Sequence, residues 1–180
     1  MPYFNIVAES TESTVVAEYE PMKRRSDSYQ SEAALENEFI RLLGEQGYAY
    51  VEIHTESELI ANLRHQLELL NSYIFTDDEW QRFFAESIAS ANDGIVEKTR
   101  RIQNDPVQIL KRDDGSTKNI TLIDKKNIHN NRLQVINQYA VGEENGAAHD
   151  NRYDVTILVN GLPLVHVELK RRGVAIREAF

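Results

Sequence analysis

Three residues near the carboxyl end of this sequence, Asp154, Glu168 and Lys170, combine types and spacing that could do chemistry together. Two adjacent carboxylates repel each other, and a divalent cation that prefers oxygen ligands relieves that repulsion. A lysine two residues after a metal-binding acid lies on the same face of a strand. The pattern predicts a Mg²⁺ site formed by Asp154, Glu168 and the backbone carbonyl of Leu169, with Lys170 beside it.

The chemistry that suits such a site is hydrolysis of a phosphodiester. Magnesium keeps several of its waters, which leaves room for a phosphate oxygen and an attacking water. The cation polarises the phosphate and lowers the pKa of a bound water, while the Lys170 ammonium stabilises or orients that water and the developing negative charge. The competing interpretation is a solvent-facing strand edge that carries ordinary charges.

Two predicted strands, at 152–160 and 163–170, must position these residues. With a connecting loop at 160–162, one face of the strand pair is wholly apolar and Asp154 lies opposite Glu168 on the other face. The expected apolar pairs are Val159 with Pro163, Ile157 with Val165, Val155 with Val167, and Tyr153 with Leu169.

A two-residue turn at Asn160 and Gly161 would instead place Asp154 opposite Val167 and break the apolar face. The pairing therefore predicts either a loop with an odd number of residues or a β-bulge. Pro163 donates no hydrogen bond to a sheet, so it fits a strand start or an edge.

A second acid-x-Lys triplet, Asp124-Lys125-Lys126, follows Asp113 and Asp114 and competes for the same role. We favour Glu168-Leu169-Lys170, because that triplet lies in an apolar strand, has an acidic partner in register and leads into a basic turn. His166 shares the expected site face, where a partly buried strand histidine with a hydrogen-bond partner is the common outcome. The polar run 127–131 is expected to form a loop.

The first half of the chain has helical periodicity. A helix is predicted from Ser31, with Gly47 as its stop. Capping boxes, in which a threonine is followed three residues later by a glutamate, predict helix starts at Thr55 and Thr76. The aromatic stripe after Thr76 is expected to be core, and a further short helix is predicted at 95–103 before Asp105-Pro106.

Strand-like periodicity begins at Pro106. The runs 107–112 and 118–124 predict a hairpin, and 132–141 predicts another strand before a polar loop at 142–151. A new helix is expected to begin at Val174. Helices, then a sheet, then a returning helix predict a mixed α/β domain.

Composition limits the possible functions. The net charge is −9, which is unfavourable for a chain that must hold polyanionic DNA unaided. Basic residues cluster locally at Lys98, Arg100 and Arg101, and at Lys170, Arg171, Arg172 and Arg177. No cysteine, secretory signal or bilayer-length apolar run is present, so we expect a cytoplasmic protein without a membrane segment.

The sequence resembles the amino-terminal nuclease domain of the restriction (R, HsdR-type) subunit of type I restriction-modification enzymes. The resemblance runs from about Tyr29 to the end, and its most distinctive pieces are 31–36, 93–95, 122–127 and 151–180. It implies a restriction-endonuclease-like PD-(D/E)xK fold in which the family's aspartate falls on Asp154 and its Glu-x-Lys on Glu168 and Lys170. Glu32 or Glu36 matches the acid that such nucleases often carry on the first helix, although surface glutamates are normal there.

The resemblance also implies the function and the partners. It implies a Mg²⁺-dependent endonuclease domain that cuts double-stranded DNA within an ATP-dependent enzyme, together with methylation and specificity subunits. No ATP-binding loop is present, so ATP is expected to bind outside this chain. We expect an amino-terminal arm at 1–28 and a nuclease domain at 29–180, incomplete because a Gln-x-x-x-Tyr motif should follow Lys170.

Two other functions remain open. One is a non-catalytic module that docks the motor of the restriction enzyme to the methylation and specificity subunits. The other is a stand-alone resolvase or repair nuclease of the same fold, which the acidic balance of the chain disfavours.

Overall fold

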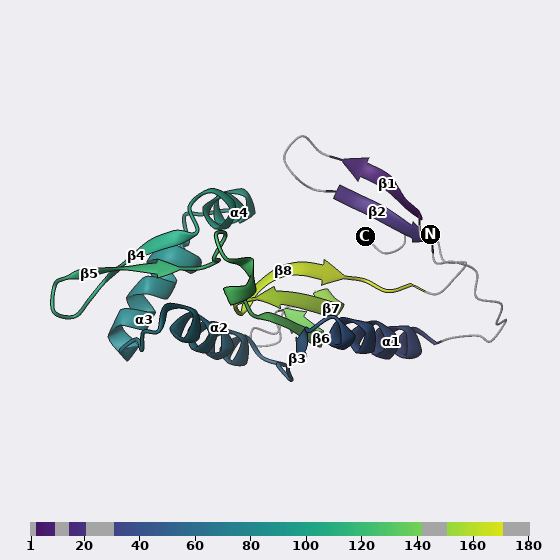
Figure 1. Ribbon diagram of the computed structural model, residues 1–180, viewed down its shortest axis with the longest axis horizontal. Coiled ribbons are helices and arrows are strands. Elements are labelled where there is room, and N and C mark those ends of the chain that lie inside the picture. Colours follow the sequence, from purple (N-terminus) through teal and green to yellow (C-terminus); the bar gives the residue numbers. More distant parts are fainter. Residues whose placement is uncertain (1–2, 10–14, 21–30, 142–150, 171–180) are drawn as a thin grey trace. The chain divides into compact units, whose positions relative to one another are not determined.

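The computed structural model of the protein describes residues 3–9, 15–20, 31–141 and 151–170 (Figure 1). The chain divides into two compact units, Met1–Gln30 and Ser31–Phe180. In the first unit, β1 (Tyr3–Glu9) and β2 (Val15–Glu20) form an antiparallel pair. These strands were not predicted, and the register shift between Ile6 and Ala8 explains why: it interrupts the period of two on which strand prediction relies.

The first two helices of the second unit begin where their capping residues predicted. In α1 (Glu32–Glu45), the Ser31 side chain accepts a hydrogen bond from the Ala34 N–H, and the chain turns away at Gly47 with φ of 92°. In α2 (Glu56–Asn71), Thr55 and Glu58 form the reciprocal bonds of a capping box.

The next helical segment is also capped as predicted, but it changes pitch. Thr76 and Glu79 form a second capping box at the start of α3 (Asp77–Phe83). The chain then continues as a π-helix, η1 (Phe84–Ile88), rather than as one regular helix. After Gly94, α4 (Ile95–Asn104) ends at Asp105 before Pro106, which confirms the fourth predicted helix.

The second unit contains two sheets. The larger one has the strand order β3-β6-β7-β8, formed by β3 (Ala49–Tyr50), β6 (Leu133–Val141), β7 (Asn151–Val159) and β8 (Leu162–Val167). The short β3 is parallel to β6, and the other neighbours are antiparallel. The hairpin β4 (Val107–Lys111) and β5 (Thr117–Thr121) forms the other sheet, and a 3₁₀ turn, η2 (Ile128–Asn130), precedes β6. The mixed α/β class is thereby confirmed.

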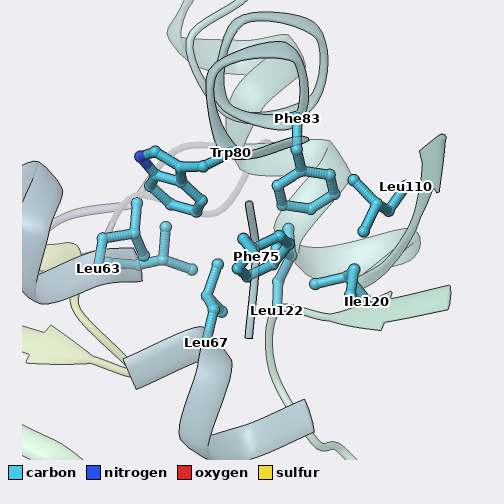
Figure 2. Packing of buried hydrophobic residues seen from close by; sticks show 9 residues of the cluster. Leu63, Leu67, Phe75, Trp80, Phe83, Leu110, Ile120 and Leu122 are labelled. Atoms are coloured by element: carbon cyan, nitrogen blue, oxygen red, sulfur yellow. The ribbon is translucent and has the colours of Figure 1, made fainter. Parts of the chain in front are cut away.

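Apolar side chains pack in three clusters within this unit. The largest joins α2 and α3 to the β4–β5 hairpin, and Figure 2 shows Phe75 among the side chains from these elements. Its buried members are Leu63, Leu67, Phe75, Trp80, Phe83, Leu110, Ile120, Leu122 and Leu162. The aromatic stripe after Thr76 is therefore core, as expected. In the described residues, no helix combines the length and the apolar character needed to cross a membrane.

The other two clusters involve the larger sheet. Leu43 of α1 packs with Val135 of β6 and Val155 of β7. Ile53 packs with another set of sheet residues, Ile136, Tyr139 and Leu158. These contacts fix β6 and β7, and β7 carries Asp154.

The turn between β7 and β8 differs from the predicted three-residue loop. It contains only Asn160 and Gly161, both with positive φ (51° and 81°), so Val159 lies opposite Leu162. The expected pairing of Val159 with Pro163 is therefore wrong by one residue. Positive φ at both positions matches the twist of a tight hairpin, which favours this turn.

A β-bulge restores the remaining predicted pairing. Leu158 lies opposite Pro163 and Ile157 opposite Val165, so Leu164 is an additional residue in β8. Beyond the bulge, Val155 lies opposite Val167, as predicted. The β-bulge, one of the two alternatives that the sequence left open, is thus present. The β7–β8 ladder ends at the pair Val155–Val167, so the predicted pairing of Asp154 with Glu168 is not among the described residue pairs.

Candidate active site

Asp154 lies in β7, one residue beyond the last residue pair of the β7–β8 ladder. Its carboxylate Oδ2 accepts a hydrogen bond of 2.6 Å from the backbone N–H of Leu169. The expected strand pairing of Tyr153 with Leu169 does not occur among the described pairs, because β8 ends at Val167. The side chain of Asp154 instead holds the segment that follows β8.

Lys170 is paired with Glu168 and attracted by Asp154. Its ammonium Nζ donates a hydrogen bond of 2.5 Å to Glu168 Oε1. The pKa of Lys170 is raised by this hydrogen bond, against a smaller opposing effect of burial, and further by attraction to Glu168, Asp154 and Glu32. The structure therefore gathers Asp154, Glu168, Leu169 and Lys170, and places the carboxylate of Glu32 from α1 within electrostatic reach.

The chemistry of these donors fits a hard divalent cation. The candidate ligands are the carboxylates of Asp154 and Glu168 and the backbone carbonyl of Leu169, and magnesium takes oxygen ligands of both kinds. Among the described residues, Asp154 uses only Oδ2 and Glu168 only Oε1 in hydrogen bonds, which leaves one oxygen of each for another ligand. The Glu168 and Lys170 side chains are each 30% exposed, so solvent reaches the site as far as the described chain determines. No set of three or more His, Cys, Asp or Glu residues suitable for a metal gathers anywhere in the described residues.

Glu36 is not a surface glutamate, contrary to the expectation for the first helix. It is 9% exposed, and its carboxylate accepts hydrogen bonds from the side-chain amides of Asn137 (2.6 Å) and Gln138 in β6. Gln138 has a positive φ of 55°, a conformation that L-residues adopt at a cost. Glu36 thus connects α1 by hydrogen bonds to β6 of the larger sheet, at the residue with the strained backbone.

A signal for this role was present in the helix. Glu36 precedes Phe39, Ile40 and Leu43 by three, four and seven residues, the spacing of one helical face. These three apolar residues belong to the cluster that packs on β6 and β7. The acidic residue therefore lies on the buried face of α1, and burial of a charge demands hydrogen-bond partners.

His166 has the hydrogen-bond partner that was expected for it. Its Nδ1 lies 2.9 Å from Oγ1 of the buried Thr156, and its ring stacks on Tyr153 with centroids 4.0 Å apart. Burial lowers the pKa of His166. These contacts describe a packed strand histidine.

The competing triplet at Asp124 forms a loop. The Asp124 Oδ1 accepts hydrogen bonds from the backbone N–H groups of Lys126 and Asn127, and its Oδ2 accepts one from the Asn130 side chain. These bonds lower the pKa of Asp124. Asp113, meanwhile, pairs with Arg82 across α3 and the hairpin turn. The carboxylates of this region therefore have structural roles, and 127–131 is a loop with one 3₁₀ turn, as expected.

A second concave region of the described surface lies away from the acidic pair. A hollow of about 620 Å³ opens where β6 begins, and its lining includes Gln66, His129 and Arg132. The Oε1 of Gln66 is buried without a hydrogen-bond partner in the described structure. Residues 171–180 and the loop 142–150 lie outside the described residues, as do the expected helix at Val174 and the basic residues Arg171, Arg172 and Arg177.

The mixed α/β fold is consistent with that of nucleases, and the acidic pair with its lysine is consistent with phosphodiester chemistry. Comparison with protein families matches residues 29–180 to the family described as type I restriction enzyme R protein N terminus. The chain therefore belongs to this family, and the resemblance seen in the sequence is confirmed.

Curated relatives carry matching names. The chain is 48% identical over 175 residues to the type I restriction enzyme EcoprrI endonuclease subunit of Escherichia coli, a match that covers 97% of this chain and 55% of that protein. It is 41% identical over 157 residues to the SsaAORF53P endonuclease subunit of Staphylococcus saprophyticus, covering 84% of this chain and 16% of the relative. It is also 41% identical over 158 residues to the SauMSSORF170P endonuclease subunit of Staphylococcus aureus, a match that covers 85% of this chain and 16% of that protein. The chain thus spans about half of one relative and a sixth of the others.

Proposed function

We propose that this chain is the nuclease part of a type I restriction enzyme and hydrolyses phosphodiester bonds of double-stranded DNA with the help of Mg²⁺. The observation that carries the proposal is the position of Lys170, which is hydrogen-bonded to Glu168 and attracted by Asp154 of β7. Membership of the R-protein family, and the endonuclease names of its relatives, support the same chemistry. The fold is proposed to be the PD-(D/E)xK core.

Asp154, Glu168 and the Leu169 carbonyl would hold the cation, which would supply a Lewis acid for the phosphate. The hydrogen bond from the Leu169 N–H to Asp154 keeps this segment beside β7. Lysine has an ordinary pKa of 10.5 and the pKa of Lys170 is raised further, so its ammonium is protonated at neutral pH and can stabilise the negative charge that develops on the phosphate. Glu168 positions that ammonium.

The rest of the enzyme is proposed to lie outside this chain. A motor that uses ATP, and subunits for methylation and sequence specificity, would act with it in the cytoplasm. The net charge of −9 supports this division, because a strongly acidic chain holds DNA poorly by itself.

Two variants in the complete restriction enzyme test the proposal. Asp154→Asn and Lys170→Met should each reduce DNA cleavage by about 100-fold or more, while ATP hydrolysis by the motor continues. Asp78→Asn, an exposed change of the same type on α3, is the matched control and should cleave normally. Thermal unfolding of this chain should be unchanged by all three substitutions.

Titration calorimetry of the chain with Mn²⁺ gives a second readout. Binding should be seen with the unsubstituted chain and lost in Asp154→Asn. Normal cleavage in both variants, together with no cation binding, would refute the nuclease assignment and favour the docking module.

A further inference from the structure

We propose that Lys125, Lys126 and Arg132, on the loop between β5 and β6, form a second contact with the DNA backbone, distinct from the acidic pair. This inference rests on the proposed function, because it assumes that DNA is the substrate. It concerns binding rather than cleavage, so it can fail separately.

The loop is held in place by its own polar side chains. Besides the three bonds to the Asp124 carboxylate, the Asn131 side chain accepts from the Asp124 N–H and donates to the Asp124 and Ile128 carbonyls. The backbone is therefore held by hydrogen bonds of the half-buried Asp124 and Asn131, whereas Lys125, Lys126 and Arg132 are exposed. A fixed backbone reduces the entropy that is lost when exposed side chains bind a ligand.

The cations of this loop form no close ion pair with a described acidic residue, and Lys126 is attracted only at longer range by Asp124. Ion pairs are formed by other basic residues of the described chain, among them Arg41, Arg64, Arg82, Arg101, Lys111, Arg112 and Lys170. In the described part of the chain, no ion pair involves Lys125, Lys126 or Arg132. Asp124 is the one acidic residue within 122–132, and its carboxylate is hydrogen-bonded to the loop itself. Three basic residues and one acidic residue make this part of the surface positive, although the chain as a whole is acidic.

Asn160 connects this surface to the strands of the site. Its side chain donates to the Leu122 carbonyl (3.0 Å) and to Asn131 Oδ1 (2.8 Å), and it accepts from the Arg132 N–H (2.8 Å). The loop therefore lies against the β7–β8 turn (Figure 1). Asn160 follows Asp154 by six positions, which corresponds to about 20 Å along an extended strand.

The separation between the loop and the acidic pair is compatible with the spacing of phosphates along a DNA duplex. A DNA helix carries a negative charge about every 1.7 Å along its axis and makes one turn in about 34 Å. A duplex whose reacting phosphate lies at the acidic pair and whose axis follows β7 would therefore have other phosphates near the loop. The lysines and the arginine would neutralise these phosphates without reading the base sequence.

The test is binding of this chain to a short fluorescent DNA duplex, measured by anisotropy across a range of salt concentrations without divalent cations. The variant Lys125→Gln/Lys126→Gln should bind about tenfold more weakly, and the slope of log affinity against log salt should fall by about two. Both side chains are exposed, so thermal unfolding should not change. The control Lys111→Gln/Lys118→Gln removes the same charge from the β4–β5 hairpin, where Lys111 already pairs with Glu86 and Lys118 lies over the Tyr73 ring.

Three results would overturn the inference: an unchanged affinity and slope in the loop variant, an equal loss in the control, or no measurable binding by the unsubstituted chain at the lowest salt. Cleavage by Asp154→Asn in the complete enzyme decides the proposed function independently. If Asp154→Asn cleaves normally and the loop variant binds DNA more weakly, the DNA contact is supported and the nuclease assignment is refuted.

Discussion

Glu36 is a carboxylate on the buried face of α1, and its position depends on two amides of β6. The Asn137 and Gln138 side chains donate to it across the interface between helix and sheet. A hydrogen bond to a charged group is worth more than one between neutral groups, and an amide left buried without an acceptor is costly. Glu36 therefore stabilises the sheet that carries Asp154.

Removal of this carboxylate should destabilise the protein. We expect Glu36→Ala to lower the free energy of unfolding by about 2 to 4 kcal/mol, and Glu36→Gln to lower it by less, because the amide retains one acceptor. Urea unfolding followed by circular dichroism measures both. Glu45→Ala, which removes an exposed partner of Arg41 on the same helix, should cost less than about 1 kcal/mol. Equal losses in the Glu36 and Glu45 variants would contradict the structural role.

At the scale of elements, the β7–β8 turn depends on close packing against α2. Gly161 has a φ of 81°, and a Cβ at this position would lie 2.6 Å from Leu63 Cα and 3.0 Å from Leu63 N. Both contacts are with backbone atoms, which cannot move aside without moving the helix. Only glycine fits here.

We therefore expect Gly161→Ala to lower the free energy of unfolding by about 3 kcal/mol or more, since it adds backbone strain to a steric clash. Gly44→Ala is the matched control, because Gly44 lies in α1 with open space around its Cα. That control should be neutral or stabilise the helix by up to about 1 kcal/mol. Thermal or urea unfolding of the two variants distinguishes them, and similar small effects would contradict the close approach.

The α3 capping box makes the junction between α3 and the β4–β5 hairpin sensitive to acid. Burial raises the pKa of Glu79, but hydrogen bonds from the Tyr73 hydroxyl, the Thr76 N–H and the Asp113 N–H outweigh burial, so the pKa lies below its ordinary value of 4.5. A carboxylate with a lowered pKa in the folded state adds stability above that ordinary value. This stability is lost as the pH falls through the folded-state pKa.

Glu79→Gln should therefore be less stable than the unsubstituted chain at pH 7, and the difference should shrink as the pH falls below about 4.5. Melting temperatures of Glu79→Gln and of the unsubstituted chain, measured over this pH range, test the expected decrease in the difference. Glu86→Gln, an exposed change on η1, should show little difference at any pH. A constant difference between Glu79→Gln and the parent would indicate that ionisation of Glu79 does not contribute.

At the scale of the whole molecule, all three described apolar clusters are formed by residues of the Ser31–Phe180 unit. A unit with its own hydrophobic core can fold independently. We expect a chain that begins at Ser31 to unfold cooperatively within about 2 °C of the melting temperature of the full chain. Scanning calorimetry provides the comparison. A much lower melting temperature would mean that Met1–Gln30 stabilises the larger unit.

Much of the fold could be predicted because its signals are local. The Ser31, Thr55 and Thr76 caps are hydrogen bonds between residues three positions apart, so the sequence alone locates the helix starts. The spacing of Glu168 and Lys170 was argued from a strand, which places every second side chain on one face, but β8 ends at Val167, before both residues. The choice between this triplet and the one at Asp124 also followed from the apolar neighbours of Glu168.

The sequence by itself thus located the helices and most strands of the Ser31–Phe180 unit and indicated the residues of the candidate site, whereas β1, β2 and the short β3 were not predicted. Only the tertiary structure decided how β7 and β8 pair through a two-residue turn and a bulge, and which glutamate of α1 is buried against β6. Those features depend on contacts between residues far apart in the chain, such as Gly161 with Leu63 and Glu36 with Asn137. Local spacing cannot specify such contacts, because their energy arises only when separate elements pack together.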